Sequence, residues 1–246
     1  MKRFKLFPYL LIFLFLFSCV KKEDDLISQD CVDECITIYG TLTTGNGTQP
    51  LKDVEVDVVW VKRQPPGTFG RLIRRNKAVA ITDNDGFYSM TFKKREDEDD
   101  QWSHFSLNIH TNENVYYSDC DENLTDMYNL PSDTLIMRNY YYPFNAFLKV
   151  IAIGGDKTKA DDNFTVEVKT KFGVNGSQEC GVIRSFKYGA AIEMADLKAG
   201  ALQDVEVVTT IRKDGESKIN SEKIYFIGIL RFCQQLFSES VVMFNW

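Results

Sequence analysis

Histidine is nearly absent from this 246-residue chain, which contains only His104 and His110. On one extended strand the two side chains would be roughly 20 Å apart, at about 3.3 Å per residue, too far to ligate one metal ion. The sequence also lacks the His-Glu-x-x-His, Gly-x-Ser-x-Gly and glycine-rich phosphate-loop motifs of metalloproteases, serine hydrolases and nucleotide-binding proteins. We therefore expect no metal, no cofactor and no catalytic residue, and a protein that is not an enzyme.

An excess of basic residues is also missing, because the chain has 29 Lys+Arg against 35 Asp+Glu. Proteins that bind nucleic acid use Lys and Arg to neutralise phosphates, so we expect no nucleic-acid partner. Hydrophobic residues make up 44% of the chain and aromatic residues 13%, which is enough for a packed core. The composition therefore predicts a folded, acidic protein.

The apolar run near the N-terminus, Leu6–Phe17, is too short to span a bilayer, which needs roughly 20 apolar residues. It follows a basic head and ends at Ser18 and Cys19, an arrangement typical of a secretory signal peptide. The cysteine directly after a small residue makes this segment resemble a bacterial lipoprotein signal. That resemblance implies cleavage of residues 1–18, lipidation of Cys19 and attachment to a membrane through the lipid. Without residues 1–18 the net charge is −9.

The charged run Lys21–Asp25 comes directly behind the predicted lipidation site. A short acidic run there resembles the surface-export signal of Bacteroidetes lipoproteins, which implies a lipid-anchored protein of the outer membrane displayed at the cell surface. A solvated tether and an inward-facing periplasmic location are the alternatives. We expect residues 19–35 to form a charged tether.

Five further cysteines fit an exported protein, because disulfides persist outside the cytoplasm. They allow at most two intrachain bridges with one thiol left over. We expect Cys180 to pair with Cys233, since both lie in the C-terminal half, and Cys120 to pair with Cys31 or Cys35. Reduced, buried cysteines are the alternative.

Alternating apolar and polar residues predict strands from residue 36 onward. In 53–60 one face carries Val54, Val56, Val58 and Trp60, and the three acidic residues share the other. In 102–110 Phe105, Leu107 and Ile109 share one face, and both histidines lie on the opposite face. Between these segments, Asp83–Gly86 is typical of a tight hairpin turn rather than a calcium loop, because acidic ligands are absent at the required positions.

Residues 36–110 resemble a carboxypeptidase regulatory-like domain. The matching parts are Gly40-Thr41-Leu42, Pro50-Leu51-Lys52-Asp53-Val54-Glu55-Val56 and Thr82-Asp83-Asn84-Asp85-Gly86-Phe87-Tyr88. The resemblance implies a prealbumin-like β-sandwich with an accessory, non-catalytic role. The long basic insertion at 61–76 departs from the family pattern.

A second strand-rich unit follows, for which we identify no family. We expect strands at 164–169 and 205–207, a hairpin at 213–216, a central strand at 224–232 and one short helix at 190–201. The aromatic stretch 140–144 is expected to pack between the two units, with a sugar-stacking platform as the alternative. The predicted fold is all-β, with two β-sandwich domains at 36–142 and 143–246.

The connection at 61–76 reverses the local charge of this acidic chain. It carries several basic residues and no acidic one. Because long loops on a rigid sandwich concentrate binding residues, we predict that Arg71, Arg74 and Arg75 contact an anionic partner such as lipopolysaccharide, an acidic glycan or an acidic protein face. A solvated loop, or one folded against the acidic run 96–100, is the alternative. That acidic run is itself expected to be solvated.

These features together predict a non-enzymatic protein that acts in binding, in scaffolding or as an accessory subunit of an envelope complex. The alternative is a cell-surface hydrolase with its site in the C-terminal domain. A Cys-His pair or a pair of carboxylates would supply its chemistry.

Overall fold

The computed structural model describes residues 21–63, 72–117, 125–153, 162–186, 192–213, 215–226 and 241–245. Within these ranges the chain is mostly β-strand, with two short 3-10 helices at Leu26–Asp30 and Glu96–Glu98. None of the helices in this part of the chain has the length and apolar character needed to cross a membrane. The predicted all-β class is confirmed. The predicted signal peptide, Cys19, Arg71, Cys120 and Cys233 lie outside the described residues.

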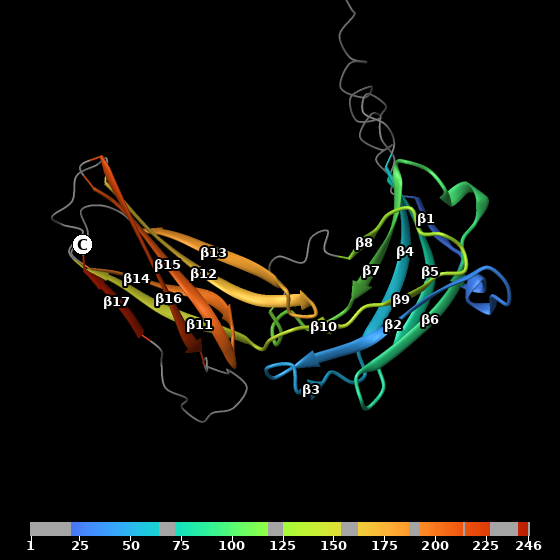
Figure 1. Cartoon of the computed structure of the whole chain (residues 1–246), viewed down its shortest axis with the longest axis horizontal. Helices are drawn as coiled ribbons and strands as arrows, with labels where there is room; N and C mark the ends of the chain where they lie inside the picture. The colour runs from blue at the N-terminus through green and yellow to red at the C-terminus, as the bar shows by residue number, and fades with distance from the viewer. Residues whose placement is uncertain are drawn as a thin grey trace, which may run out of the picture.

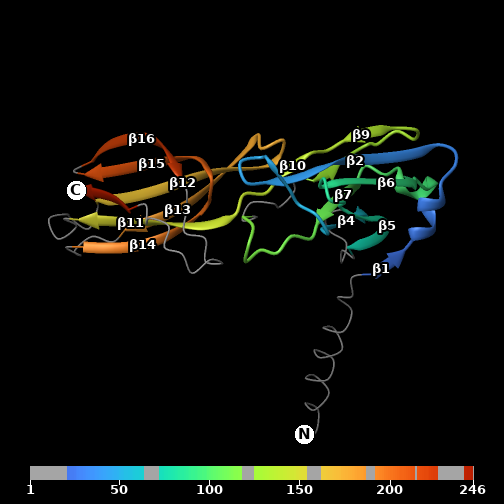
Figure 2. The same ribbon diagram turned by 90° about the horizontal axis from the view of Figure 1, so that it is seen from below.

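The first β-sandwich packs two sheets against each other (Figures 1 and 2). One sheet has the order β1 (Lys21–Asp24), β5 (Ile73–Ile81), β4 (Glu55–Lys62), β7 (Ser103–Ile109) and β8 (Asp126–Met127). The other is built on β2 (Cys35–Thr44), which pairs with β3 (Gln49–Pro50), β6 (Phe87–Lys93), β9 (Leu135–Met137) and β10 (Tyr140–Tyr141). The core lies between them and includes Ile36, Trp60 and Phe105.

The alternation predicted for β4 and β7 is confirmed by burial. Val56 and Val58 are fully buried and Trp60 is 2% exposed, whereas Glu55 faces solvent. In β7, Leu107 is likewise fully buried. The opposite face of the same strands, which carries Val59 and Val61 of β4 beside polar residues, is left outside the core.

The second β-sandwich is also made of two sheets around a separate hydrophobic core. One has the order β14 (Ile192–Gly200), β11 (Asn145–Ile153) and β17 (Val241–Asn245). The other holds β12 (Asn163–Val174), β13 (Gln178–Phe186), β15 (Gln203–Lys213) and β16 (Glu216–Phe226). The hairpin predicted at 213–216 is confirmed by the pairing of Lys213 with Glu216.

The short strand β10 joins the two sandwiches. It pairs in parallel with β2 and antiparallel with β12, so one sheet continues from the first sandwich into the second. Tyr140 and Tyr142 are buried in the first core, and Phe144 packs against the second. The prediction that the aromatic stretch packs between the two units is confirmed.

One prediction for the second unit was wrong. The helix expected at 190–201 is strand β14, which pairs with β11 over nine residues from Asn145 to Ile153, so sheet pairing overrides its helix-forming composition. Most of the central strand expected at 224–232 lies outside the described residues, and its first three residues belong to β16. That strand ends the sheet order and pairs, within the described residues, with β15 alone.

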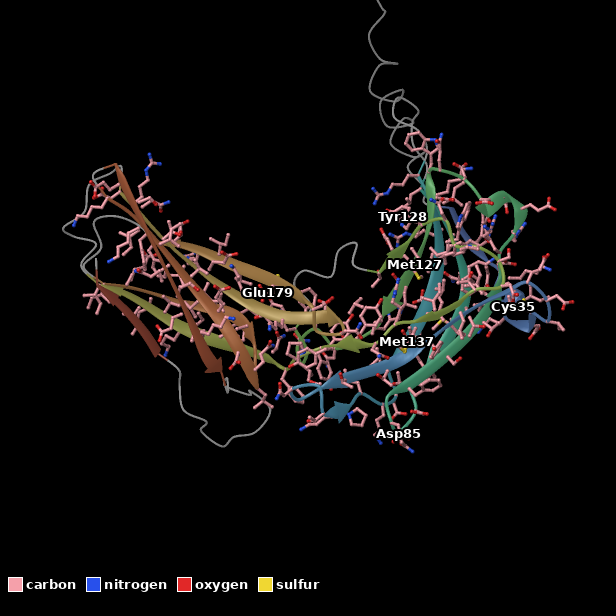
Figure 3. The ribbon with its side chains drawn as sticks, in the orientation of Figure 1. Cys35, Asp85, Met127, Tyr128, Met137 and Glu179 are labelled. Carbon is pink, nitrogen blue, oxygen red and sulfur yellow. A yellow bond between two sulfur atoms is a disulfide. The ribbon has the colours of Figure 1, made fainter. Side chains whose placement is uncertain are left out.

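The segment expected to be a tether is part of the first sandwich. Lys21–Asp24 forms β1 in parallel with β5, and Cys31 is bonded to Cys35 with a Cα–Cα distance of 5.8 Å. The expected pairing of Cys120 with one of these cysteines was therefore wrong. Glu34, with a φ of 57°, turns the chain between the two cysteines and lets so short a loop close. Cys35 marks the outer end of β2 in Figure 3.

The turn at Asp83–Gly86 forms as predicted. The Asp83 carboxylate accepts hydrogen bonds of 2.9 Å from the backbone N–H groups of Asp85 and Phe87, and Gly86 has a φ of 72°. A Cβ at Gly86 would lie 2.5 Å from the carbonyl oxygen of Leu42, so the position requires glycine. The turn is not a hairpin, however. It connects β5 of one sheet to β6 of the other, at the tip where Asp85 is labelled in Figure 3.

Candidate functional site

The outer face of the sheet formed by β5, β4, β7 and β8 carries a groove of about 420 Å³. The groove is lined by Val59, Val61, Arg63, Leu72, Arg74, His104, Ser106, Asn108, Thr125 and Asp126. Register explains how these residues meet. Val61 of β4 lies between Arg74 of β5 and His104 of β7, and the next row along β4 places Val59 beside Ser106. The polar face predicted for 102–110 thus becomes one wall of the groove.

Arg63 and Arg74 supply the positive charge of the groove. Both are exposed, and neither forms an ion pair with another described residue. Arginines of this kind can each present a planar set of N–H donors to a carboxylate, sulfate or phosphate group. Of the predicted anion-binding residues, Arg74 is therefore placed where it can act, and Arg63 was missed. The sequence signal for Arg63 was its place in the basic stretch, which puts it at the same end of the β4–β5 pair as Arg74.

Hydrogen-bonding side chains make up the rest of the groove. His104 Nε2 lies 3.4 Å from Asp126 Oδ1, and the Ser106 hydroxyl lies 3.3 Å from the Thr125 hydroxyl. Burial lowers the pKa of His104 below its ordinary value of 6.5, an effect that Asp126 opposes and Arg63 reinforces. His104 is therefore neutral at pH 7.

The groove contains serine, histidine and aspartate, but it does not form a catalytic triad. In a triad the serine hydroxyl is hydrogen-bonded to the histidine that takes its proton. Here the Ser106 hydroxyl pairs with Thr125, and His104 faces Asp126. Both histidines of the chain belong to the first sandwich. The C-terminal domain, where the alternative places a hydrolase site, therefore has no histidine for a Cys-His pair.

Arg75 is not part of the groove, and its predicted contact with an anionic partner was wrong. It is 4% exposed, its guanidinium lies 4.7 Å from the ring centre of Trp60, and it is ion-paired with Glu23, Asp97 and Glu98. Burial alone would lower the pKa of Arg75. The hydrogen bonds to these acids outweigh burial, so the pKa lies above its ordinary value. Successive residues of a strand point to opposite faces, so Arg74 faces out and Arg75 faces in.

Lys77 belongs to the same buried network. Its side chain is fully buried and its ammonium lies 2.5 Å from Asp25 and 3.0 Å from Glu98. The acidic run 96–100 is therefore only partly solvated, and the expectation was wrong for Glu98. Its residue Glu98 is 3% exposed, and Asp100 lies 2.5 Å from Lys62. Of the described residues of the basic stretch, Lys62 and Arg75 fold against this acidic run, as the alternative has it, whereas Arg63 and Arg74 face the groove.

Glu55, Asp57 and His110 form a second cluster on the outer face, which the sequence did not predict. The histidine follows β7 and the two acids lie on β4, so their proximity depends on the strand register. His104 and His110, as expected, do not converge on one site, because each faces a different aspartate.

Cys180, on β13 of the second sandwich, is disulfide-bonded. Cys233, its predicted partner, lies outside the described residues, so this pairing stays a prediction.

Comparisons with known proteins give no family. No family model matches the chain. No curated protein matches it either. The resemblance of residues 36–110 to carboxypeptidase regulatory-like domains therefore stays a prediction.

Several solved structures show a distant likeness. The shaft pilin SpaA of Lactobacillus rhamnosus GG has 10% identity, covers 87% of this chain and 97% of its own, and has a TM-score of 0.30. A streptococcal ancillary pilin has 11% identity over 86% of this chain and 62% of its own, with a TM-score of 0.29. A candidate cell adhesion protein from Bacteroides ovatus has 10% identity over 78% and 87%, with a TM-score of 0.20. TM-scores this low do not support transfer of a function.

Proposed function

We propose that this chain is a non-enzymatic binding protein of the bacterial cell surface, and that its outer-face groove holds an anionic glycan. The observation that carries the proposal is the pair Arg63 and Arg74, both exposed and without a carboxylate partner among the described residues, at one end of the groove. The chain has 35 acidic residues, and five of those in the first sandwich are paired with other cations, namely Glu23, Asp25, Asp97, Glu98 and Asp100.

The lining of the groove fits a sugar polymer better than a simple ion. Val59, Val61 and Leu72 form an apolar floor, while His104, Ser106, Asn108 and Thr125 offer hydrogen bonds to hydroxyl groups. Seven of the ten lining residues are polar or charged, which suits a ligand rich in hydroxyl groups. The two arginines then select ligands that carry carboxylate or sulfate groups.

An exported location supports the same role. The predicted signal peptide and lipidation of Cys19 would place the protein in the outer membrane, and the Cys31–Cys35 disulfide fits an oxidising compartment. A Cys19→Ser variant should be recovered in the soluble fraction, whereas the native chain should sediment with membranes. Sedimentation of the variant at the native level would contradict lipidation at Cys19.

Binding to immobilised dextran sulfate tests the groove directly, because its sulfate groups stay ionised across the useful pH range. The native protein should be retained at low salt and released by a salt gradient, as expected for ionic contacts. The double variant Arg63→Gln/Arg74→Gln should pass through or elute at clearly lower salt. Arg212→Gln, which removes an exposed arginine from the second sandwich, serves as the control.

Two outcomes would contradict the proposal. Native protein that is not retained would exclude a sulfated ligand of this kind. Equal retention of the native protein and the double variant would place the contact elsewhere on the molecule.

A further inference from the structure

Glu55, Asp57 and His110 place three metal-ligating groups together on the outer face of the first sandwich. One ligand atom from each residue lies within 4.8 Å of the other two, and His110 Nε2 is 4.0 Å from Glu55 Oε1. His110 Nε2 also contacts Asp57 Oδ1 directly. On a tetrahedral zinc ion, with metal–ligand distances of about 2.0–2.2 Å, neighbouring ligand atoms lie roughly 3.3–3.5 Å apart. Small side-chain rotations therefore bring all three to one ion.

The backbone holds the three residues in place. Glu55 and Asp57 are two apart on β4, so both side chains point to the same face. The N–H of His110 donates a 3.0 Å hydrogen bond to the carbonyl oxygen of Glu55, which fixes the histidine opposite the first acid. Sites held by strand ladders vary less in geometry than sites on loops.

Asp57 is also oriented from outside the trio. The Asn108 side-chain amide donates a 2.9 Å hydrogen bond to Asp57 Oδ2, which leaves Oδ1 directed at His110. Such outer contacts commonly orient metal ligands and affect metal affinity. Asn108 stands opposite Asp57 in the ladder between β4 and β7.

We propose that Glu55, Asp57 and His110 bind a zinc ion. Calcium and magnesium prefer sets made only of oxygen ligands, so the imidazole favours zinc or a similar transition metal. Two carboxylates balance the charge of the ion. Three protein ligands leave a position open for water or for a group from another molecule. This site is separate from the two arginines, and the proposal does not depend on glycan binding.

Calorimetric titration with zinc chloride tests the proposal on the purified full-length chain in detergent, prepared without a histidine tag. The native protein should bind one zinc ion per chain at this site, and calcium chloride should give no comparable binding. His110→Gln should weaken zinc binding at least tenfold, and Asp57→Asn should do the same. His104→Gln is the matched control, because His104 lies on the same face but pairs with Asp126.

Circular dichroism should show that all three variants remain folded, and zinc should raise the melting temperature of the native protein but not of His110→Gln. If His110→Gln does not fold, the Asp57→Asn variant decides the question. Absence of zinc binding by the native protein would overturn the proposal. So would equal affinity of the native protein, His110→Gln and Asp57→Asn, since the zinc would then be bound elsewhere, for example at a free cysteine.

Discussion

At the scale of single residues, the neighbours Arg74 and Arg75 show how one position along a strand decides the role of a charge. Both are arginines of the same basic stretch, yet one faces the groove and the other is enclosed by three acids and Trp60. The sequence showed the excess of basic residues. It could not show which arginine points inward, because that depends on where β5 begins and on its partner β4.

Glu98→Gln should strongly destabilise the protein, because it leaves the buried cations Arg75 and Lys77 without their shared carboxylate. Removing one partner from a buried ion pair costs about 3–5 kcal/mol. Glu96→Gln, on the exposed side of the same 3-10 helix, should change the free energy of unfolding by less than about 0.5 kcal/mol. Urea unfolding measures both. Equal stabilities for the two variants would mean that the network does not stabilise the fold.

His104 should make ligand binding stronger in acid. Its pKa is lowered by burial, so the ring gains its proton only as the pH falls below the ordinary histidine value of 6.5. Protonation adds a positive charge to a groove that holds Arg63 and Asp126. Retention on dextran sulfate should therefore rise on acidification, and His104→Gln should remove that rise. An unchanged pH profile in the variant would show that His104 does not face the ligand.

At the scale of elements, regular alternation was a reliable guide and composition was not. Strands β4 and β7 were predicted from their apolar and polar faces, and burial confirms them. Residues 190–201 contain good helix formers, but their pairing with β11 makes them a strand. Pairing with a segment 39 to 55 residues away in sequence leaves no local signal.

The acidic segment behind the predicted lipidation site shows the same limit. Its charges suggested solvation, yet Glu23 and Asp25 are partners of the buried Arg75 and Lys77. An unpaired buried charge costs several kcal/mol, so cations buried on β5 require acids nearby. The sequence contained both halves of the network without indicating that they meet.

Docking of β1 should protect it from proteolysis. Trypsin should cleave slowly after Lys21 and Lys22 in the native protein, and quickly in Glu23→Gln/Asp25→Asn, which weakens the ion pairs that hold the strand. Asp24→Asn is the control, because Asp24 is exposed and bonds locally to the N–H of Leu26. Rapid cleavage of the native protein at these lysines would restore the interpretation as a tether.

The same two variants, Glu23→Gln/Asp25→Asn and Asp24→Asn, separate docking from export. If the acidic run is a surface-export signal, each lost charge should reduce exposure of the protein to added protease on intact cells, including the charge of Asp24. If only the docking variant loses exposure, the effect arises from folding rather than from the signal.

At the scale of the whole molecule, two sandwiches share one continuous sheet through β10, and Figure 2 shows them arranged end to end. Two strand-rich units could be predicted from the sequence. The pairing of β10 with both β2 and β12 could not be predicted, because a strand of two tyrosines does not indicate which strands it pairs with or in which register. The groove was also hidden, since its walls come from four strands that are distant in sequence.

Methyl NMR with a short dextran sulfate oligosaccharide shows directly whether an anionic glycan binds in the groove. Val59 and Val61 line the groove, whereas Val166 and Val207 lie in the core of the second sandwich. Titration should shift the methyl signals of Val59 and Val61 and leave those of Val166 and Val207 unchanged. Shifts confined to other residues, or no shifts at all, would contradict binding of an anionic glycan in the groove.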